Sequence, residues 1–190
     1  MSAQPIGVIL AGGRGRRIGG DKALVALHGR PLLHYPLEAL RVVLDDVVVV
    51  CKEQTVLPPL PGPVSIWCEN DPDHHPLIGV AAALREAGGR PIVVCAADMP
   101  LVTPEAIRAL LAAPAGAVAV VVRADGRLQP LLARYAPEAL PVLEAMILHE
   151  PATQVVERLE PAVVEMHADV AFNVNAPEDI LHASARLSRT

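Results

Sequence analysis

The sequence predicts a three-layer, doubly wound α/β sandwich on a mostly parallel sheet with one antiparallel strand, and a single domain over residues 1–190. Short Val-rich apolar runs recur along the chain, and longer stretches of helical character separate them. The Val-rich runs do not alternate with polar residues, which is typical of parallel strands that helices cover on both faces. Strands that alternate with helices in this way define the doubly wound class, whose ligands bind beyond the carboxyl ends of the strands.

The individual elements follow from apolar runs and capping residues, taken in chain order. Apolar runs predict strands at 6–10, 47–51, 64–68, 91–98, 118–122, 128–135 and 162–166, of which 128–135 is expected to be antiparallel. Helical patterns predict helices at 31–44, 77–87, 103–113, 137–148 and 152–159, and a last helix from Pro177. Thr103 suits the N-cap of its helix, and Pro104 suits the first helical position.

Composition limits the classes of function. Hydrophobic residues make up 52% of the chain and charged residues 19%, as in globular proteins. A net charge of −5 and only 2% aromatic residues provide neither attraction for a polyanion nor stacking platforms, so we expect no nucleic-acid binding. No run approaches the roughly 20 apolar residues that span a bilayer, and no signal-peptide pattern opens the chain. We therefore expect a soluble cytoplasmic protein, with Cys51, Cys68 and Cys95 as buried free thiols.

The segment GVILAGGRGRRIGGDKAL concentrates glycine and positive charge on an otherwise acidic chain. Gly12 and Gly13 allow the backbone to approach a ligand closely, and exposed amides there form a concavity for anions. Arg17 and Lys22 can neutralise a polyphosphate. The dinucleotide fingerprint and the P-loop both fail here, the latter because Ala23 follows Lys22. The spacing leaves two interpretations, a phosphate-binding loop and a flexible basic loop.

Two acids follow predicted strands. Asp98 ends the apolar run PIVVCAAD, where an unpaired carboxylate is costly to bury. It is either a Mg²⁺ ligand or a cap for the next element. Asp71, in CENDPD, also lies just past a strand.

Two further polar pairs invite a functional interpretation. His74 and His75 lack a Cys or Glu partner at metal-ligand spacing, so we expect them to face solvent. In AFNVNAPEDI, Asn173 and Asn175 are expected on an alternating strand with their side chains on the same side. A strand end followed by a turn explains that spacing without a binding role.

Taken together, three segments resemble the molybdenum cofactor guanylyltransferase family. LAGGRGRRIGGDKAL is similar to the signature L-A-G-G-x-x-x-R-(M/I)-G-x-D-K, CAADMPLVTPE to the Asp-x-Pro segment at a strand end, and FNVNAPEDI to the Asn-x-Asn-x-Pro-Glu close. The motifs occur in the right order and cover nearly the whole chain. The resemblance implies a Rossmann-like nucleotidyltransferase fold.

The resemblance also implies roles for individual residues. Asp98 would hold Mg²⁺ and act in catalysis together with Arg17 and Lys22. Asp71 would lie near the nucleoside, and the segment with Asn173 and Asn175 beside the second substrate. The nucleotide would be lined by Leu10, Ala11, Gly12 and Gly13, with Lys22 on its phosphates and Arg17 supporting the loop. Three positions depart from the family, which often has Gly where this chain has His75, Asn where it has Cys51, and Thr where it has Ala176.

The implied activity is GMP transfer from GTP to the terminal phosphate of molybdopterin, with release of pyrophosphate. The resemblance favours guanine because related cytidylyltransferases usually read Leu-Ala-Ala-Gly where this chain reads Leu-Ala-Gly-Gly. The alternatives are a transferase that uses CTP or activates a sugar phosphate or phospholactate, and a non-catalytic nucleotide-binding protein. We expect a monomer that makes transient contacts with cofactor-biosynthesis or molybdoenzyme partners.

Overall fold

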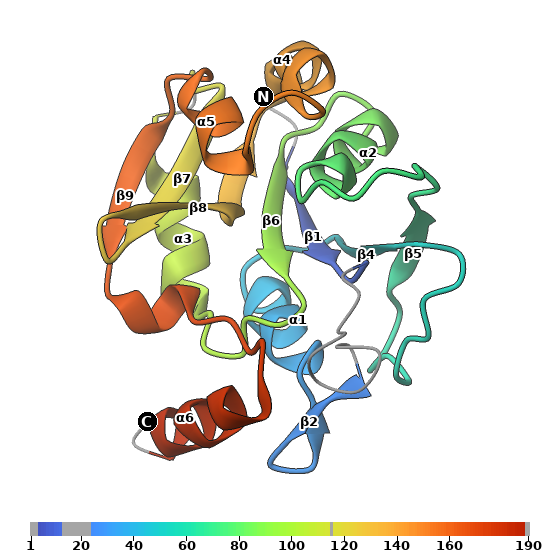
Figure 1. Cartoon of the computed structure of the whole chain (residues 1–190), viewed down its shortest axis with the longest axis vertical. Helices are drawn as coiled ribbons and strands as arrows, with labels where there is room; N and C mark the ends of the chain where they lie inside the picture. The colour runs from blue at the N-terminus through green and yellow to red at the C-terminus, as the bar shows by residue number, and fades with distance from the viewer. Residues whose placement is uncertain (1–3, 13–23, 115, 189–190) are drawn as a thin grey trace.

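A parallel-rich sheet with helices on both faces forms the centre of the computed structural model, which describes residues 4–12, 24–114 and 116–188 (Figure 1). In these residues seven strands form the sheet in the order β5-β4-β1-β6-β8-β7-β9. The strands are β1 (Ile6–Leu10), β4 (Val47–Cys51), β5 (Ser65–Cys68), β6 (Ile92–Ala96), β7 (Ala119–Ala124), β8 (Arg127–Tyr135) and β9 (Ala162–Met166). As the sequence predicts, β8 is antiparallel to both of its neighbours and the other pairs are parallel.

Helices cover the sheet in two layers. On one face lie α1 (His34–Arg41) and α3 (Pro104–Ala112), and on the other α2 (Ile78–Glu86), α4 (Leu140–Met146) and α5 (Ala152–Glu157). Short 3₁₀ helices, η2 (Pro137–Ala139) and η3 (Ala168–Ala171), and the last helix, α6 (Pro177–Leu187), complete the described chain. The predicted three-layer α/β class is confirmed.

The Val-rich strands pack against both helix layers because successive side chains point to opposite faces of the sheet. Ile9 and Val49 pack with α1 and α3, whereas Val8 and Val48 pack with α2. Every residue of β4 and β6 is buried, which explains why these runs lack polar alternation. The N-cap prediction also holds, since the Thr103 hydroxyl accepts a hydrogen bond from the Ala106 amide at 3.3 Å.

The helix predicted at 31–44 is shorter than expected at both ends. Arg30 and Pro31 form β3, which pairs antiparallel with β2 (Ala26–Leu27) in a small hairpin. Its two turn residues, His28 and Gly29, both have positive φ, at 51° and 73°, as in the type I′ turns that connect hairpins. Strands of two residues are too short to produce a recognisable alternation, so they could not be predicted from the sequence.

The prediction that Asn173 and Asn175 lie on a strand is wrong. After η3, residues 172–176 have irregular backbone, and the Val174 amide donates to the Asp98 carbonyl at 2.9 Å. The Asn173 side chain donates to the Ala171 carbonyl at 2.9 Å. This local side chain–backbone bond replaces a strand ladder. The segment therefore crosses towards the end of β6 instead of extending the sheet.

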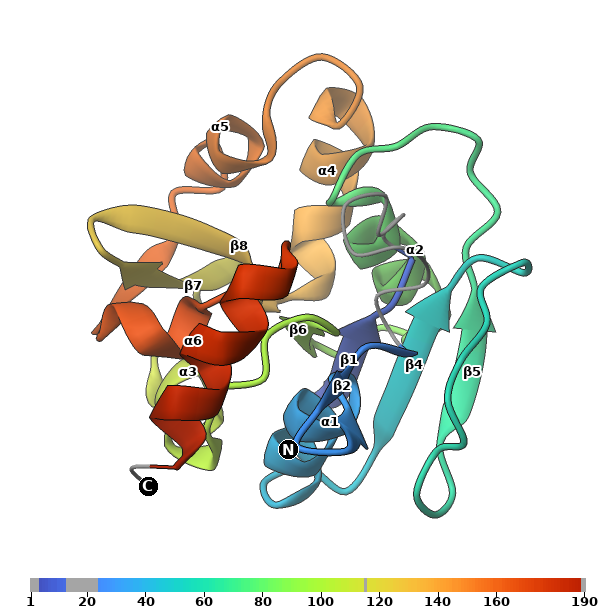
Figure 2. The same cartoon turned by 60° about the horizontal axis from the view of Figure 1, so that its bottom comes forward.

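A small third core attaches the end of the chain to the β2–β3 hairpin. Leu27 and Leu32 pack against Val174 and Ala183 of the last segment and α6. In Figure 1 α6 and β2 lie together below the sheet, and Figure 2 turns this side towards the viewer. The C-terminal segment is thereby held next to the carboxyl edge of the sheet.

Candidate functional site

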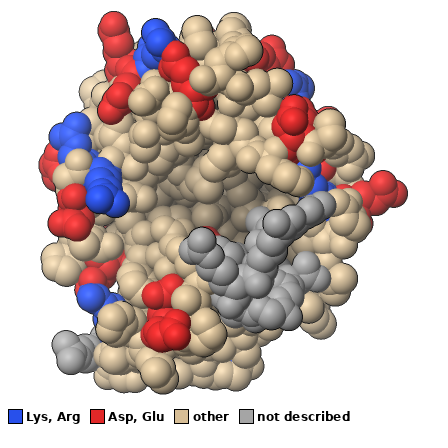
Figure 3. Space-filling model, viewed as in Figure 1, with Lys and Arg blue, Asp and Glu red and all other residues tan. Residues whose placement is uncertain are grey.

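The carboxyl ends of β5, β4, β1 and β6 meet at one edge of the sheet and enclose a pocket of about 460 Å³. The chain order reverses beside β1, because β4 and β5 lie on one side of it and β6 on the other. Such a switch point is where doubly wound sheets bind ligands. The face drawn in Figure 3 is hollowed near its middle, where uncharged side chains predominate and charged ones lie around the rim. The pocket lining comprises Leu10–Gly12, Val50–Lys52, Glu69, Asp73–Pro76, Gly79, Ala96–Asp98 and Leu131.

The first wall is the backbone that follows β1. The Leu10 carbonyl accepts from the Ala97 amide at 3.0 Å, and the Ala11 amide donates to the Val50 carbonyl at 2.8 Å. These bonds fix the chain between its two neighbours through Ala11, and Gly12 is the second residue past β1. Leu10, Ala11 and Gly12, which the sequence predicts at the nucleotide, all line the pocket. Their predicted partners Gly13, Arg17 and Lys22 lie outside the described residues.

The start of α2 forms the second wall and approaches β1 closely. A Cβ added at Gly79 would lie 2.9 Å from Leu10 Cδ2, closer than real Cβ contacts allow. Glycine at this position therefore lets the first turn of α2 pack against the end of β1. Because a helix N-terminus carries partial positive charge, this wall is favourable for an anionic ligand.

Asp98 provides a carboxylate on the β6 side of the pocket. It lies two residues past β6, is half-buried and lines the pocket. Its carbonyl accepts from Val174, so the backbone of the Asn173–Asn175 segment is bonded to the residue that the sequence predicts as a metal ligand. Together with Leu10–Gly12, the structure thus brings parts of all three sequence motifs to the same edge of the sheet.

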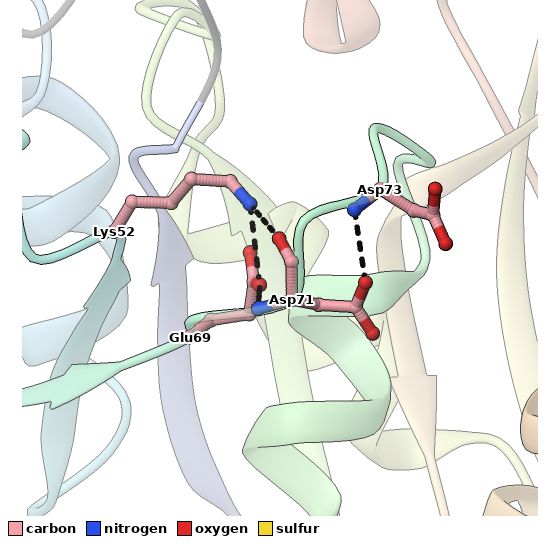
Figure 4. Close-up of polar contacts among 4 residues, drawn as sticks. All are labelled: Lys52, Glu69, Asp71 and Asp73. Carbon is pink, nitrogen blue, oxygen red and sulfur yellow. Dashed lines mark hydrogen bonds and ion pairs between the residues drawn. The ribbon is translucent and has the colours of Figure 1, made fainter.

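A buried charged pair, which the sequence analysis missed, lies at the opposite end of the pocket (Figure 4). Lys52 Nζ lies 3.4 Å from Glu69 Oε1, and the side chains are only 13% and 10% exposed. Lys52 also donates to the Asp71 carbonyl, and the Asp71 amide donates to Glu69 Oε1 at 2.5 Å. Both residues directly follow strands, β4 and β5, so the rule that singled out Asp98 could have found them.

Asp71 occupies a different place from its neighbour Glu69. Its carboxylate accepts from the Asp73 amide at 3.0 Å and closes the turn, and the pocket lining includes Glu69 and Asp73 but not Asp71. A role for Asp71 near the nucleoside stays a prediction.

His75 also lines the pocket, contrary to the expectation that both loop histidines face solvent. His74 is exposed, whereas His75 is half-buried and makes two hydrogen bonds. The Leu77 amide donates to Nδ1 at 3.2 Å, and Nε2 lies 3.1 Å from the Glu150 carbonyl. Burial lowers the pKa of His75, and the bond to Glu150 opposes this only in part.

The three cysteines are free, but they do not share one environment. Cys51 and Cys95 are buried as predicted, whereas Cys68 is exposed because β5 is the edge strand of the sheet. Burial raises the pKa of the Cys51 thiol, with a smaller contribution from neighbouring Cys68, and burial also raises the pKa of Cys95. Cys51 therefore presents an uncharged thiol to the pocket.

A second pocket of about 780 Å³ opens between the β7–β8 hairpin, β9 and α5. Asn173 lines it, together with Arg123 and Arg127, and Arg123 is paired with Glu165 at 2.7 Å. Asn175 does not line this pocket, and its backbone amide donates to the Asp179 carboxylate at 2.7 Å. The two asparagines thus have different surroundings, and their role beside a second substrate stays a prediction.

In the described part of the chain, no group of three or more His, Cys, Asp or Glu side chains is arranged to hold a metal ion. None of the helices in residues 4–12, 24–114 and 116–188 has the length and apolarity needed to cross a bilayer.

The sheet order, the antiparallel β8 and the pocket at the switch point define an α/β protein with a candidate ligand site at the carboxyl edge of its sheet, and the family comparison identifies its class as nucleotidyltransferase. Residues 7–163 match the MobA-like NTP transferase domain, and the chain belongs to that family. It is 40% identical to a molybdenum cofactor guanylyltransferase of Pseudomonas putida over 72% of this chain and 73% of the relative. A probable molybdenum cofactor guanylyltransferase of Chloroflexus aggregans is 32% identical over 97% and 95% of the two chains.

Solved structures agree on the fold. The crystal structure of molybdopterin-guanine dinucleotide biosynthesis protein A from Archaeoglobus fulgidus superposes with a TM-score of 0.74 at 28% identity, over 97% of this chain and all of the other. A cytidylyltransferase from Thermus thermophilus reaches a TM-score of 0.71 at 22% identity, over 98% of this chain and all of the other. The second likeness shows the fold alone.

Proposed function

We propose that the chain transfers GMP from GTP to the terminal phosphate of molybdenum-bound molybdopterin, forming molybdopterin guanine dinucleotide and pyrophosphate. The observation that carries the proposal is the pocket, which places the Leu10–Gly12 backbone and Asp98 at one switch point in a chain similar to guanylyltransferases. Its volume lies within the range of about 300–1,000 Å³ of small-molecule sites. GTP spans it from the β4–β5 end towards Asp98.

The chemistry needs few side chains. An oxygen of the molybdopterin phosphate attacks the α-phosphorus of GTP, and the bond from that phosphorus to the bridging oxygen of the β-phosphate breaks. A phosphate monoester with a second pKa of about 6 is mostly ionised at neutral pH, so no general base is required. Positioning and charge neutralisation then supply the catalysis. In this proposal Arg17 and Lys22 provide cationic charge, and the glycines at positions 12 and 13 allow the phosphates to approach the backbone closely.

Asp98 fits the proposed Mg²⁺. Mg²⁺ prefers oxygen ligands and is commonly held by one or two carboxylates together with substrate phosphates and water. A half-buried carboxylate at a strand end that lines the pocket meets this requirement. Mg²⁺ would stabilise the negative charge on the phosphates as the bond to pyrophosphate breaks. Asp98 would hold the ion at the β6 side of the pocket.

The second pocket is proposed for molybdopterin. It has room for a fused-ring compound, and Asn173, Gln129 and Arg127 offer hydrogen-bonding groups. The Val174–Asp98 bond connects its margin to the nucleotide pocket. This arrangement supports attack from the β8 side of the nucleotide.

Calorimetric titration with GTP and with CTP, both with Mg²⁺, tests the nucleotide assignment. We expect clear preference for GTP, and preference for CTP would contradict a guanylyltransferase. Incubation with GTP and molybdopterin should then release pyrophosphate and form the dinucleotide. Binding of GTP without any release in the presence of molybdopterin would instead indicate a non-catalytic nucleotide-binding protein.

A further inference from the structure

His75 connects two parts of the chain that lie far apart in sequence. On one side its Nδ1 accepts from the Leu77 amide, at the start of α2. On the other side its Nε2 bonds to the carbonyl of Glu150, in the turn between α4 and α5. The first contact closes the loop that lines the nucleotide pocket, and the second reaches across to the neighbouring pair of helices.

The partners determine which nitrogen carries the proton. The Leu77 amide can only donate, so Nδ1 must present a lone pair. The Glu150 carbonyl can only accept, so Nε2 must carry the hydrogen. Both bonds are therefore satisfied together only by the neutral imidazole with its proton on Nε2.

The turn that receives this bond is itself fixed to α5. The Glu150 carboxylate pairs with the Arg158 guanidinium, including an Nε to Oε2 bond of 2.7 Å. Glu150 thus bonds His75 through its backbone and Arg158 through its side chain. This chain of bonds ends at Arg158, the residue that follows Glu157, and Glu157 and Thr153 of α5 line the second pocket.

We propose that neutral His75 is a positioning residue that fastens the nucleotide-pocket wall at the start of α2 to the α4–α5 turn. This inference rests on the proposed function, since it concerns how GTP is held relative to the second substrate. Protonation of Nδ1 would place two hydrogens face to face at Leu77 and release the start of α2. The loop of residues 73–76 would then be free to withdraw from the nucleotide.

The charged surroundings determine the pH range of this effect. Among the described residues, Asp73 and His74 flank His75 on its own loop, and the α4–α5 turn contributes His149 and Glu150. Arg158 neutralises the Glu150 carboxylate. Because burial lowers the pKa of His75, its bonds should persist at neutral pH and be lost as pH falls below about 6.5, the ordinary histidine value.

Nuclear magnetic resonance tests the geometry without any ligand. The ¹⁵N shifts of the His75 ring should identify the Nε2–H form at neutral pH, and the Leu77 amide should lose exchange protection on acidification. In His149→Asn both signals should behave as in the wild type, because that exposed histidine is not part of the bonded chain. An Nδ1–H ring at neutral pH would overturn the inference.

Calorimetry with GTP and Mg²⁺ tests the positioning role. Between about pH 7.5 and 5.5, the wild type should lose about fivefold more affinity than His75→Asn, the factor that one hydrogen bond contributes. His149→Asn should retain the wild-type loss. If His75→Asn fails to unfold cooperatively on heating, His75→Gly replaces it. Equal pH dependence in the wild type and the His75 variant refutes positioning, whereas absence of GTP binding at every pH contradicts the proposed function itself.

Discussion

Lys52 and Glu69 offer the sharpest test of how the pocket is built. At 3.4 Å and an effective dielectric constant of about 20, their attraction is about 5 kcal/mol before desolvation is subtracted. Desolvation of two nearly buried charges cancels much of that gain. Lys52→Met removes one charge and leaves the Glu69 carboxylate with the Asp71 amide. We therefore expect this variant to lower the free energy of unfolding by about 2 to 3 kcal/mol.

Glu69→Gln should cost less, about 1 kcal/mol, because an amide oxygen can still accept from Lys52 and from the Asp71 amide. In the double variant both charges are gone, so its loss should be smaller than the sum of the two single losses. The sum of the two single losses minus the loss in the double variant is the coupling energy of the pair, and we expect it to be at least about 1 kcal/mol.

Urea unfolding followed by tryptophan fluorescence is the assay. Trp67 is the chain's single tryptophan and lies on β5, two residues before Glu69, so it reports on this part of the sheet. Arg85→Met is the matched control, since Arg85 and Glu144 form an ion pair at 2.8 Å but are about half exposed. Its effect should stay within about 0.5 kcal/mol. If Lys52→Met is no more destabilising than this control, the pair is effectively solvated and the reasoning fails.

Two further predictions concern the other walls of the pocket. Asp98→Ala should lower pyrophosphate release at least about 100-fold and abolish its response to added Mg²⁺, and near-wild-type turnover would remove the metal role. Gly79→Ala should keep the free energy of unfolding within about 1 kcal/mol of the wild-type value, because the better helix propensity of Ala offsets the crowding. The added methyl group should nevertheless push the Leu10 side chain into the pocket and weaken GTP binding about threefold or more. Gly116→Ala, where a Cβ meets nothing within 4 Å, is its control, and equal GTP affinity in the two variants would contradict the prediction.

The fold was predictable because its central strands are uniformly apolar and buried. Runs such as VVVVC are buried on both faces, so their composition alone identifies central strands. The β2–β3 hairpin was not predicted because each of its strands has only two residues. Residues 173–175 alternate between polar and apolar side chains, as a strand does, but the bond from the Asn173 side chain to the Ala171 carbonyl holds Asn173 in irregular backbone.

The site was predictable where position along a strand decides it. Asp98 and Leu10–Gly12 reach the pocket because the strands that precede them are parallel neighbours. Lys52 and Glu69 follow the same rule at β4 and β5, yet their pairing depends on the register that sets Cys51 beside Cys68. The role of His75 depends on Glu150, 75 residues away, and no local pattern reports such a contact.

The bond from Val174 to Asp98 has a consequence for where this protein can be shortened. The family match ends at residue 163, but the segment that joins the Asp98 carbonyl lies beyond it, as do Val174 and Ala183 of the third core. A chain cut at the family boundary would keep every strand of the sheet except the last three residues of β9. It would nevertheless expose Leu27 and Leu32 and remove the Val174 amide that donates to the Asp98 carbonyl. A shortened chain that keeps the third core therefore has to extend into α6, although the last strand of the sheet ends at Met166.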